Sequence, residues 1–503
     1  MRCCWRIPVH PNTGAAAITR SEPGSLQLEV RLASGASCSV VVSPESRVRD
    51  VKAQAQEQLK RRFLALSFRH QRLDVESGLA ELGVRDGDIV DAIVQPIQLA
   101  CTTGAFALHA TGGSLLAWGD PAYAGDSSQV RERLVRVQQV QATFSAFAAV
   151  LRDGSVVTWG DPDEGGDSSH VQEQLVHVQQ IQATHGAFAA ILDDGSVVTW
   201  GIDDYGGDSR QVQEQLVRVR QIHATCGAFA AILDDGSVVA WGDERGGDSS
   251  AVQEQLVCVQ KIQASARAFA AILHNGSVVT WGPSESGGDS SQVQQKLVRV
   301  QHIQATNGAF AAILDDGSVV AWGDPHEGGD TSQVREQLVR VRQIQATHGA
   351  FAAIRDDGSV LSWGSPDHGG DCRRVREQML RVHQIQATES SLAAILEDGS
   401  VVTWGDPEQG GDSSWVQKQL AGVQQIQATR SAFAAILEDG SVVTWGNPFS
   451  GGDSSRVRQR LVRVQQIQAT HVSFAAILDN GSVVTWGDCC SGGDSSKIQL
   501  DSL

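Results

Sequence analysis

Hydrophobic and polar residues alternate along this chain in a pattern that recurs about every 41 residues. In the unit at residues 178–218, the stretch 180–183 (QIQA) alternates polar and apolar side chains, which is typical of a half-buried strand. Residues 188–192 (FAAIL) form a short apolar run that fits a strand covered on both faces. Residues 196–200 (SVVTW) are rich in β-branched residues. Each unit therefore predicts three strands.

The polar residues between these strands predict turns and one short helix. Asp194-Gly195 is a hairpin signal because glycine accepts a positive φ, and Asn275-Gly276 stands in the same place in a later unit. After the third strand comes a variable loop ending in Gly-Gly-Asp-Ser. Val212, Leu216 and Val219 then follow at helical spacing, so a short helix is expected there.

A Trp-Gly pair marks the period. Ten tryptophans carry it: Trp118, Trp159, Trp200, Trp241, Trp281, Trp322, Trp363, Trp404, Trp445 and Trp486. The step is 41 residues except from Trp241 to Trp281, where it is 40, because one loop residue is missing. A single unit cannot bury its own apolar face, so stacked units must bury it together. The repeated tryptophan is accordingly expected to be a packing residue.

The order A-x-x-x-F-A-A-I-L-x-D-G-S-V-V-x-W-G-D resembles the regulator of chromosome condensation (RCC) repeat. The resemblance covers residues 97–503 and implies a mainly β fold, an RCC-like β-propeller of small blades. The loop after Trp-Gly departs from the family pattern, and ten units exceed the usual seven. The sequence is therefore compatible with a closed ring, with an open spiral of blades and with two incomplete rings.

Residues 26–95 resemble ubiquitin. The text LQLEVRLASGASCSVVVSPESRVRDVKAQAQEQ runs strand, turn, strand and helix, and LALSFRHQRLDVESGLAELGVRDGDIVDAIV follows. Alternating apolar positions at 28, 30 and 32 predict a strand, and those at 48, 51 and 55 share one helical face. The resemblance implies a ubiquitin-like β-grasp domain. Residues 1–25 are expected to be a flexible tail.

Two departures from ubiquitin bear on function. The chain continues through Gln95-Pro96 where ubiquitin ends in Gly-Gly, so conjugation is not expected. Of the three residues of the ubiquitin recognition patch, the resemblance gives an apolar counterpart to one, Ile93. The other two fall at Ser67 and Asp91. Ile93 is therefore the candidate protein-binding residue of this domain.

Charge and cysteine usage narrow the function further. The net charge is −18, which repels phosphate backbones, so nucleic acid is not an expected partner. The nine cysteines form no C-x-x-C pair and follow no disulfide or zinc spacing. Reduced thiols in the cytoplasm or nucleus are the simplest interpretation. No apolar stretch is long enough for a membrane span, so no membrane partner is expected.

The sequence contains no phosphate-binding loop, metalloprotease motif or nucleophile elbow. No cofactor, metal or catalytic residue is therefore expected, and the chain is not expected to be an enzyme. His185, His348 and His471 occupy the same place in their units, but other units put unlike residues there. An exposed, tolerant loop is the favoured interpretation. Cys489 and Cys490 are adjacent, and on a strand their side chains would point apart.

Positions that vary between units are the candidate binding residues, because loops on a rigid repeat carry binding. Trp415 lies at the expected helix start, and Phe449 lies in the loop after a Trp-Gly pair. We add His185 and His348 from the shared loop position. An exposed tryptophan is a frequent anchor of protein interfaces.

These observations favour a non-catalytic scaffold, in which a ubiquitin-like module is tethered to a repeat domain that binds a protein client. Ubiquitin-pathway components are a further class of expected partner. RCC-type repeats also occur in large HECT-type ubiquitin ligases, so a substrate adaptor related to those ligases is one alternative. RCC-type propellers also act as guanine-nucleotide exchange factors for small GTPases, which is a second. A related propeller senses ultraviolet light through clustered tryptophans, but here they occur once per unit.

Overall fold

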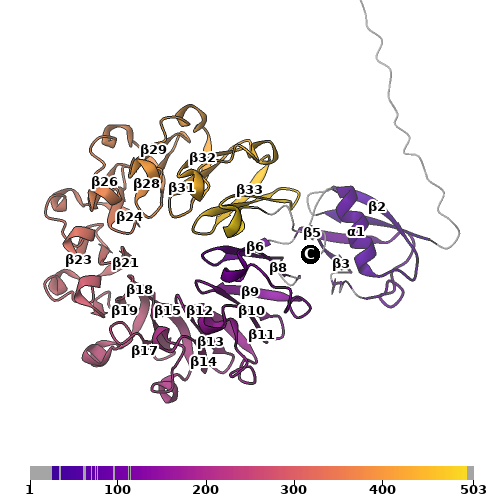
Figure 1. Cartoon of the computed structure of the whole chain (residues 1–503), viewed down its shortest axis with the longest axis horizontal. Helices are drawn as coiled ribbons and strands as arrows, with labels where there is room; N and C mark the ends of the chain where they lie inside the picture. The colour runs from indigo at the N-terminus through magenta and orange to yellow at the C-terminus, as the bar shows by residue number, and fades with distance from the viewer. Residues whose placement is uncertain are drawn as a thin grey trace, which may run out of the picture. The chain divides into compact units, whose positions relative to one another are not determined.

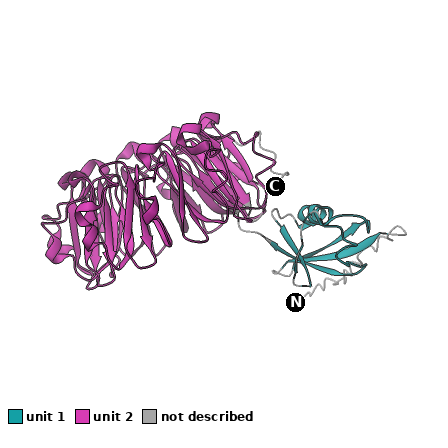
Figure 2. Cartoon of the chain, turned by 90° about the horizontal axis from the view of Figure 1, so that it is seen from below, with its two compact units in different colours: residues 1–95 teal, residues 96–503 magenta. Residues whose placement is uncertain are grey.

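The computed structural model describes residues 25–32, 36–59, 64–69, 71–73, 75, 77–94, 97–110, 113 and 115–494. The chain divides into two compact units, residues 1–95 and 96–503 (Figure 2). Almost all of the expected N-terminal tail lies outside the described residues. In the described part of the chain, no helix has both the length and the apolar character that crossing a membrane requires.

The first unit is one mixed sheet with a helix. Its elements are β1 Leu26–Leu32, β2 Ser37–Val42, α1 Val48–Leu59, β3 Leu64–Phe68, β4 Gln71–Arg72 and β5 Ile89–Val94. The strand order is β2-β1-β5-β3-β4, with β1 and β5 parallel and the other neighbours antiparallel. Leu28 and Val30 of β1 are fully buried in one core with Val51 and Ala55 of α1, so both predicted periodicities are confirmed.

The second unit contains ten separate three-stranded antiparallel sheets, which we call blades. Figure 1 shows the first strand of each blade beside the central opening and the third strand at the outside. The first strands are β6 Ile97–Cys101, β9 Val137–Ala142, β12 Val178–Ala183, β15 Val219–Ala224, β18 Val259–Ala264, β21 Val300–Ala305, β24 Val341–Ala346, β27 Val382–Ala387, β30 Val423–Ala428 and β33 Val464–Ala469. The second are β7 Ala105–Ala110, β10 Ala146–Leu151, β13 Ala187–Leu192, β16 Ala228–Leu233, β19 Phe269–Leu273, β22 Ala309–Leu314, β25 Ala350–Arg355, β28 Ser391–Leu396, β31 Ala432–Leu437 and β34 Ser473–Leu478. The third are β8 Leu115–Gly119, β11 Val156–Gly160, β14 Val197–Gly201, β17 Val238–Gly242, β20 Val278–Trp281, β23 Val319–Gly323, β26 Val360–Gly364, β29 Val401–Gly405, β32 Val442–Gly446 and β35 Val483–Gly487.

The predicted strands and hairpin turns are confirmed. The middle strand β13 is buried from Ala187 to Ile191, because small alanines let neighbouring blades cover both of its faces. At the turn into β14, Gly195 has φ +79°, and an added Cβ would lie 2.6 Å from the Cα of Arg218. Glycine is therefore required there both for its backbone angle and for the close approach of the next linker.

The predicted short helix is wrong. Most linkers between blades contain only a brief 3-10 turn: η4 Gln213–Gln215, η5 Ser250–Gln255, η7 Gln294–Lys296, η9 Arg335–Gln337, η11 Arg376–Gln378, η13 Gln417–Gln419 and η15 Arg458–Arg460. Leu216 ends the turn and packs inward, while Val219 already belongs to the next strand. The helix-like spacing of these residues therefore comes from a turn followed by a strand. Further short turns follow the third strands: η1 Pro121–Tyr123, η2 Pro162–Gly166, η3 Asp203–Tyr205, η6 Ser284–Ser286, η8 Pro325–Glu327, η10 Pro366–His368, η12 Pro407–Gln409, η14 Pro448–Ser450 and η16 Cys489–Gly493.

The Trp-Gly tryptophan joins each blade to the one before it. Trp200 stacks on Phe188 of its own blade, with ring centroids 5.2 Å apart, and its Nε1 donates to the Gly165 carbonyl of the preceding blade at 3.0 Å. Nine of the ten tryptophans donate in this way. The packing role expected for this tryptophan is confirmed, and the structure adds a buried hydrogen bond to it.

The same contact joins the last blade to the first. Trp118 Nε1 donates to the Gly492 carbonyl at 3.1 Å, and Cys101 Sγ donates to the Ala469 carbonyl at 3.1 Å. Each blade takes all three strands from its own unit, so closing the ring needs no leftover strand. The blades therefore form one ring of separate sheets, and neither an open spiral nor two incomplete rings describes it.

Candidate functional site

Ten short loops, each between the first and second strand of a blade, meet at one end of the ring. We call this end the mouth. A threonine or serine fixes each loop: Thr184 Oγ1 accepts a hydrogen bond from Ala187 N at 3.0 Å and donates to the Tyr205 carbonyl at 2.9 Å. Backbone hydrogen bonds then link loop to loop, as from Phe144 N to the His185 carbonyl at 2.9 Å. These bonds run in series from the Thr103 loop to the His471 loop and hold the ten loops in place around the mouth.

The loops surround a cavity of about 800 Å³. Ten residues that follow the fixed threonine or serine line it: Thr103, Phe144, His185, Cys226, Ala266, Asn307, His348, Glu389, Arg430 and His471. Their framework is nearly the same in every unit, yet these ten side chains include aromatic, cationic, anionic, amide and apolar groups. The mouth is therefore a mixed surface presented on a repeated scaffold.

Aromatic rings cluster on one side of the mouth. Phe144 stacks on His185, with ring centroids 3.9 Å apart, and meets His471 edge-on at 6.3 Å. Burial lowers the pKa of His185, and the nearby His471 lowers it further. Burial also lowers the pKa of His471, assisted by Arg430. The lowered pKa values favour the neutral form of both imidazoles, so the cluster presents flat aromatic faces.

Charged groups lie next to this cluster. Glu389 accepts from Arg430 Nε at 2.9 Å and lies 3.5 Å from His348 Nε2. Burial lowers the pKa of His348, although the Glu389 carboxylate acts in the opposite direction. Side by side, the two clusters could contact both an apolar side chain and a charged one on a partner.

The two thiols of the mouth are poor nucleophiles. Burial raises the pKa of Cys226. Cys101 is reached by solvent from the cavity but is surrounded by protein atoms, which raises the pKa of its thiol to about 11. A thiol attacks as the thiolate, so neither is activated at neutral pH.

The expected loop at His185, His348 and His471 does vary between units, but the expectation that it is exposed is wrong. All three are partly buried and line one cavity. Their shared position in the repeat was the available signal. Ring closure, which brings equal positions of distant units face to face, was the missing step.

The other candidate residues lie elsewhere. Trp415 is 64% exposed and precedes η13, in the linker between β29 and β30. Phe449 is 83% exposed in η14, after β32. Neither lines the mouth cavity. Ile93 is 57% exposed on β5 of the first unit, where Asp91 is paired in register with Ser67. All three side chains are thus exposed, and Trp415 and Phe449 lie outside the mouth cavity of their own unit.

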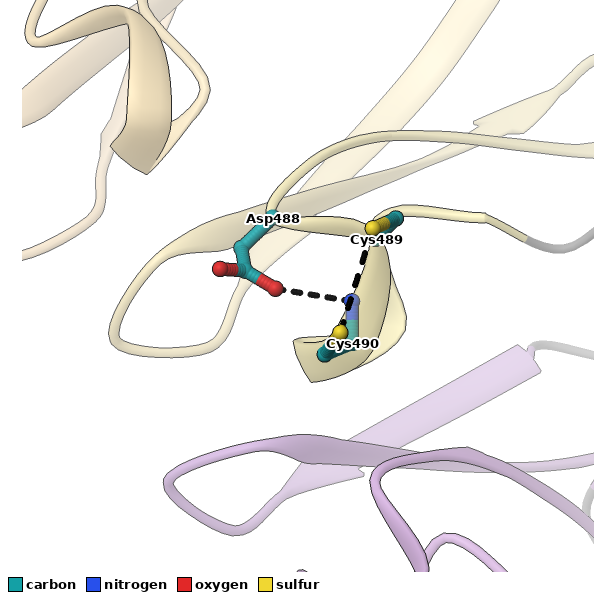
Figure 3. Close-up of side chains that lie close together, drawn as sticks. All are labelled: Asp488, Cys489 and Cys490. Atoms are coloured by element: carbon teal, nitrogen blue, oxygen red, sulfur yellow. Dashed lines mark hydrogen bonds between the residues drawn. The ribbon is translucent and has the colours of Figure 1, made fainter.

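Cys489 and Cys490 do not point apart, because they lie in η16 after the strand has ended. Their Sγ atoms are 3.9 Å apart, and the Asp488 carboxylate accepts from Cys490 N at 2.7 Å (Figure 3). One ligand atom from each of these three residues lies within 4.8 Å of the others. Thiolate and carboxylate are zinc ligands. Of the described residues, these are the ones that bring three such donors together, although both cysteines are exposed.

No protein-family model matches the chain, and no curated protein matches it. Solved structures with some similarity exist. One is Prp20p from Saccharomyces cerevisiae, at 15% identity and a TM-score of 0.33, covering 70% of this chain and 84% of that one. A computationally designed protein, Ika8, shares 14% identity at a TM-score of 0.31, covering 62% and 96%. Ubiquitin from Caldiarchaeum subterraneum shares 23% identity at a TM-score of 0.14, covering 14% and 96%.

Proposed function

We propose that this chain is a non-catalytic protein-interaction platform whose ring binds a protein partner at the mouth. One observation carries the proposal: ten units repeat their framework almost unchanged, while ten side chains of eight residue types meet around a single cavity of about 800 Å³. Binding sites are usually concave and combine apolar surface with a few polar groups, as this one does.

The chemistry of the mouth supports binding rather than catalysis. Its thiols have raised pKa values, and its glutamate is engaged by Arg430 and His348. Rigid loops that present varied residues are the usual place for recognition on repeat scaffolds. Phe144 stacked on His185 is the aromatic surface that a partner would bury first.

We further propose that residues 26–95 are a ubiquitin-like β-grasp module and residues 97–503 an RCC-type propeller, acting in the cytoplasm or nucleus. The parallel central pair β1 and β5, covered by α1, supports the first assignment. Partner classes follow from it: ubiquitin-pathway components for the module, and a client for the ring. Prp20p is described by its binding to Gsp1p and histones, so a small GTPase is one client class to look for.

Affinity capture from native lysate with quantitative mass spectrometry tests this function. The mouth variant combines Phe144→Asn, His185→Ala and His471→Ala. Each substitution uses a residue that another unit already carries at that place. The fold should therefore be retained. The matched controls are Trp415→Gln and Phe449→Glu, which do the same outside the mouth. We expect the mouth variant to lose the client and both controls to keep it.

Capture that is unchanged in the mouth variant but lost in Trp415→Gln would move the binding site to the linkers and contradict the proposal. Ubiquitin-pathway proteins recovered with the wild-type chain and lost in Ile93→Asp would support the adaptor alternative. If a small GTPase exchanges its nucleotide faster when the chain is added, the exchange-factor function is supported in place of the scaffold function.

A further inference from the structure

The first strands of the ten blades lie beside the central opening of the ring, which we call the channel (Figure 1). They contain no aspartate or glutamate. They do contain arginine, lysine and histidine, at six positions that all fall in five consecutive strands, β15 to β27: Arg220, His223, Lys261, His302, Arg342 and His383. The first strands are thus free of carboxylates, and their arginines and lysine, Arg220, Lys261 and Arg342, all lie on one side, in a chain whose net charge is −18 with histidine counted as neutral.

Four of these residues line a cavity of about 690 Å³ shared by β15, β18, β21 and β24, namely His223, Lys261, His302 and Arg342. Its volume falls within the roughly 300–1,000 Å³ of ligand sites. In Figure 1 these four strands lie side by side along the central opening. The basic side chains therefore face one shared space.

The cations of this cavity are not neutralised by carboxylates of the fold. Among the described residues, neither Lys261 nor Arg342 forms an ion pair. Arg342 instead donates to the Val382 carbonyl of the next strand at 2.8 Å, which holds its guanidinium in place. His223 Nε2 is buried without a hydrogen-bond partner. An unpaired buried polar atom costs free energy that a ligand would recover.

Glutamine amides fill much of the remaining wall, including Gln221, Gln263 and Gln304. An amide side chain offers both donors and an acceptor, which matches the alternating groups of a peptide backbone. Together, the amides would satisfy a backbone while the cations bind carboxylates.

We propose that this channel cavity binds an acidic peptide segment of a protein partner, with aspartate or glutamate side chains against Lys261, His302 and Arg342. The inference deepens the proposed function by naming the chemistry of the partner. A long nucleic acid would meet repulsion from the net charge of −18, whereas a short acidic segment meets mainly the local cations once salt screens the distant acids.

Fluorescence anisotropy of the full chain tests this with two labelled probes, a peptide of about ten residues rich in glutamate and the same peptide with glutamine. The channel variant is Lys261→Gln, His302→Gln and Arg342→Gln, which restores the glutamine that other blades carry at these places. The matched control is His170→Gln, Arg335→Gln and Lys418→Gln, which removes the same residue types from exposed linkers.

We expect the wild-type chain and the control to bind the glutamate peptide at least about tenfold more tightly than the glutamine peptide, since charge-assisted hydrogen bonds are about twice as strong as neutral ones. The channel variant should lose that preference. Equal binding of both peptides, or the same loss in the control, would overturn the inference. So would a single-stranded oligonucleotide that binds the channel more tightly than the peptide.

The two proposals fail separately. A client that is captured through the mouth, with no preference for the glutamate peptide, overturns this inference and leaves the platform standing. If the channel carries a glutamate preference but the client is still captured by the mouth variant, the platform proposal is overturned and this inference stands.

Discussion

Trp281 is the one Trp-Gly tryptophan whose indole nitrogen is buried without a partner among the described residues. The loop that should supply its acceptor follows Trp241 and is one residue shorter than in the other units. At the equivalent glycine of the next loop, Gly287, φ is +86°, whereas Gly246 of the short loop lies outside the positive-φ region. The missing residue thus displaces the loop carbonyl that would accept a hydrogen bond from the Trp281 indole. Inserting one proline between Asp243 and Glu244 restores the loop pattern Asp-Pro-x-x-Gly-Gly of Asp161–Gly166.

The insertion should stabilise the contact between the fourth and fifth blades by about 1–2 kcal/mol. A net hydrogen bond contributes about 0.5–1.5 kcal/mol, and an unsatisfied buried N–H costs about 1–3 kcal/mol, so forming the bond recovers part of both. Proline has a fixed φ, so ordering it loses little entropy.

Native-state hydrogen exchange of the β19 amides measures the gain, because it reports the local free energy of opening. Exchange should slow by about tenfold or more, since 1.4 kcal/mol corresponds to a factor of ten. The Trp281 indole N–H should also become protected. The control is the same insertion in a Trp281→Phe background, where no indole can donate. Equal slowing in both backgrounds, or none in either, would refute the reasoning.

Three further predictions concern the ring. Gly422→Ala should lower the free energy of unfolding by about 1 kcal/mol, because only its φ of +66° is strained. Gly492→Ala should lower it more, because its Cβ would also lie 2.6 Å from Phe106 Cδ2. Equal urea midpoints for the two variants would contradict this. The mouth histidines have folded-state pKa values below the ordinary 6.5. The folding free energy that they contribute is therefore fully present above pH 6.5 and is lost as the pH falls through their lowered pKa values. A variant with all three changed to glutamine should show a flatter melting-temperature profile between pH 7 and about 5. Hydrogen bonding to Cys489 raises the pKa of Cys490, so Cys489→Ser should speed alkylation of Cys490, measured by mass spectrometry, while the buried Cys372 stays slow.

Short-range patterns were enough to predict most elements. The alternation in QIQA, the apolar run FAAIL and the Asp-Gly turn each depend on contacts within one unit or with its direct neighbour. The helix over 212–219 was wrong because apolar spacing alone does not distinguish a helix from a 3-10 turn followed by a strand.

The candidate site could be predicted only in part. The shared position of His185 and His471 was visible in the sequence, but the contact of Phe144 with both depends on closure between the first and last blades. No local pattern encodes that contact. Likewise, the repeat places Cys489 and Cys490 in the loop after Trp486-Gly487, but it does not reveal the turn η16, in which their Sγ atoms come close together.

Hydrogen–deuterium exchange of the full chain, alone and with its captured client, tests the central claim most directly. We predict protection at the mouth loops, residues 143–145, 184–186, 429–431 and 470–472, with the linker at Trp415 unchanged. Protection confined to the linkers or to residues 26–95, with the mouth exchanging as in the free chain, would contradict the account.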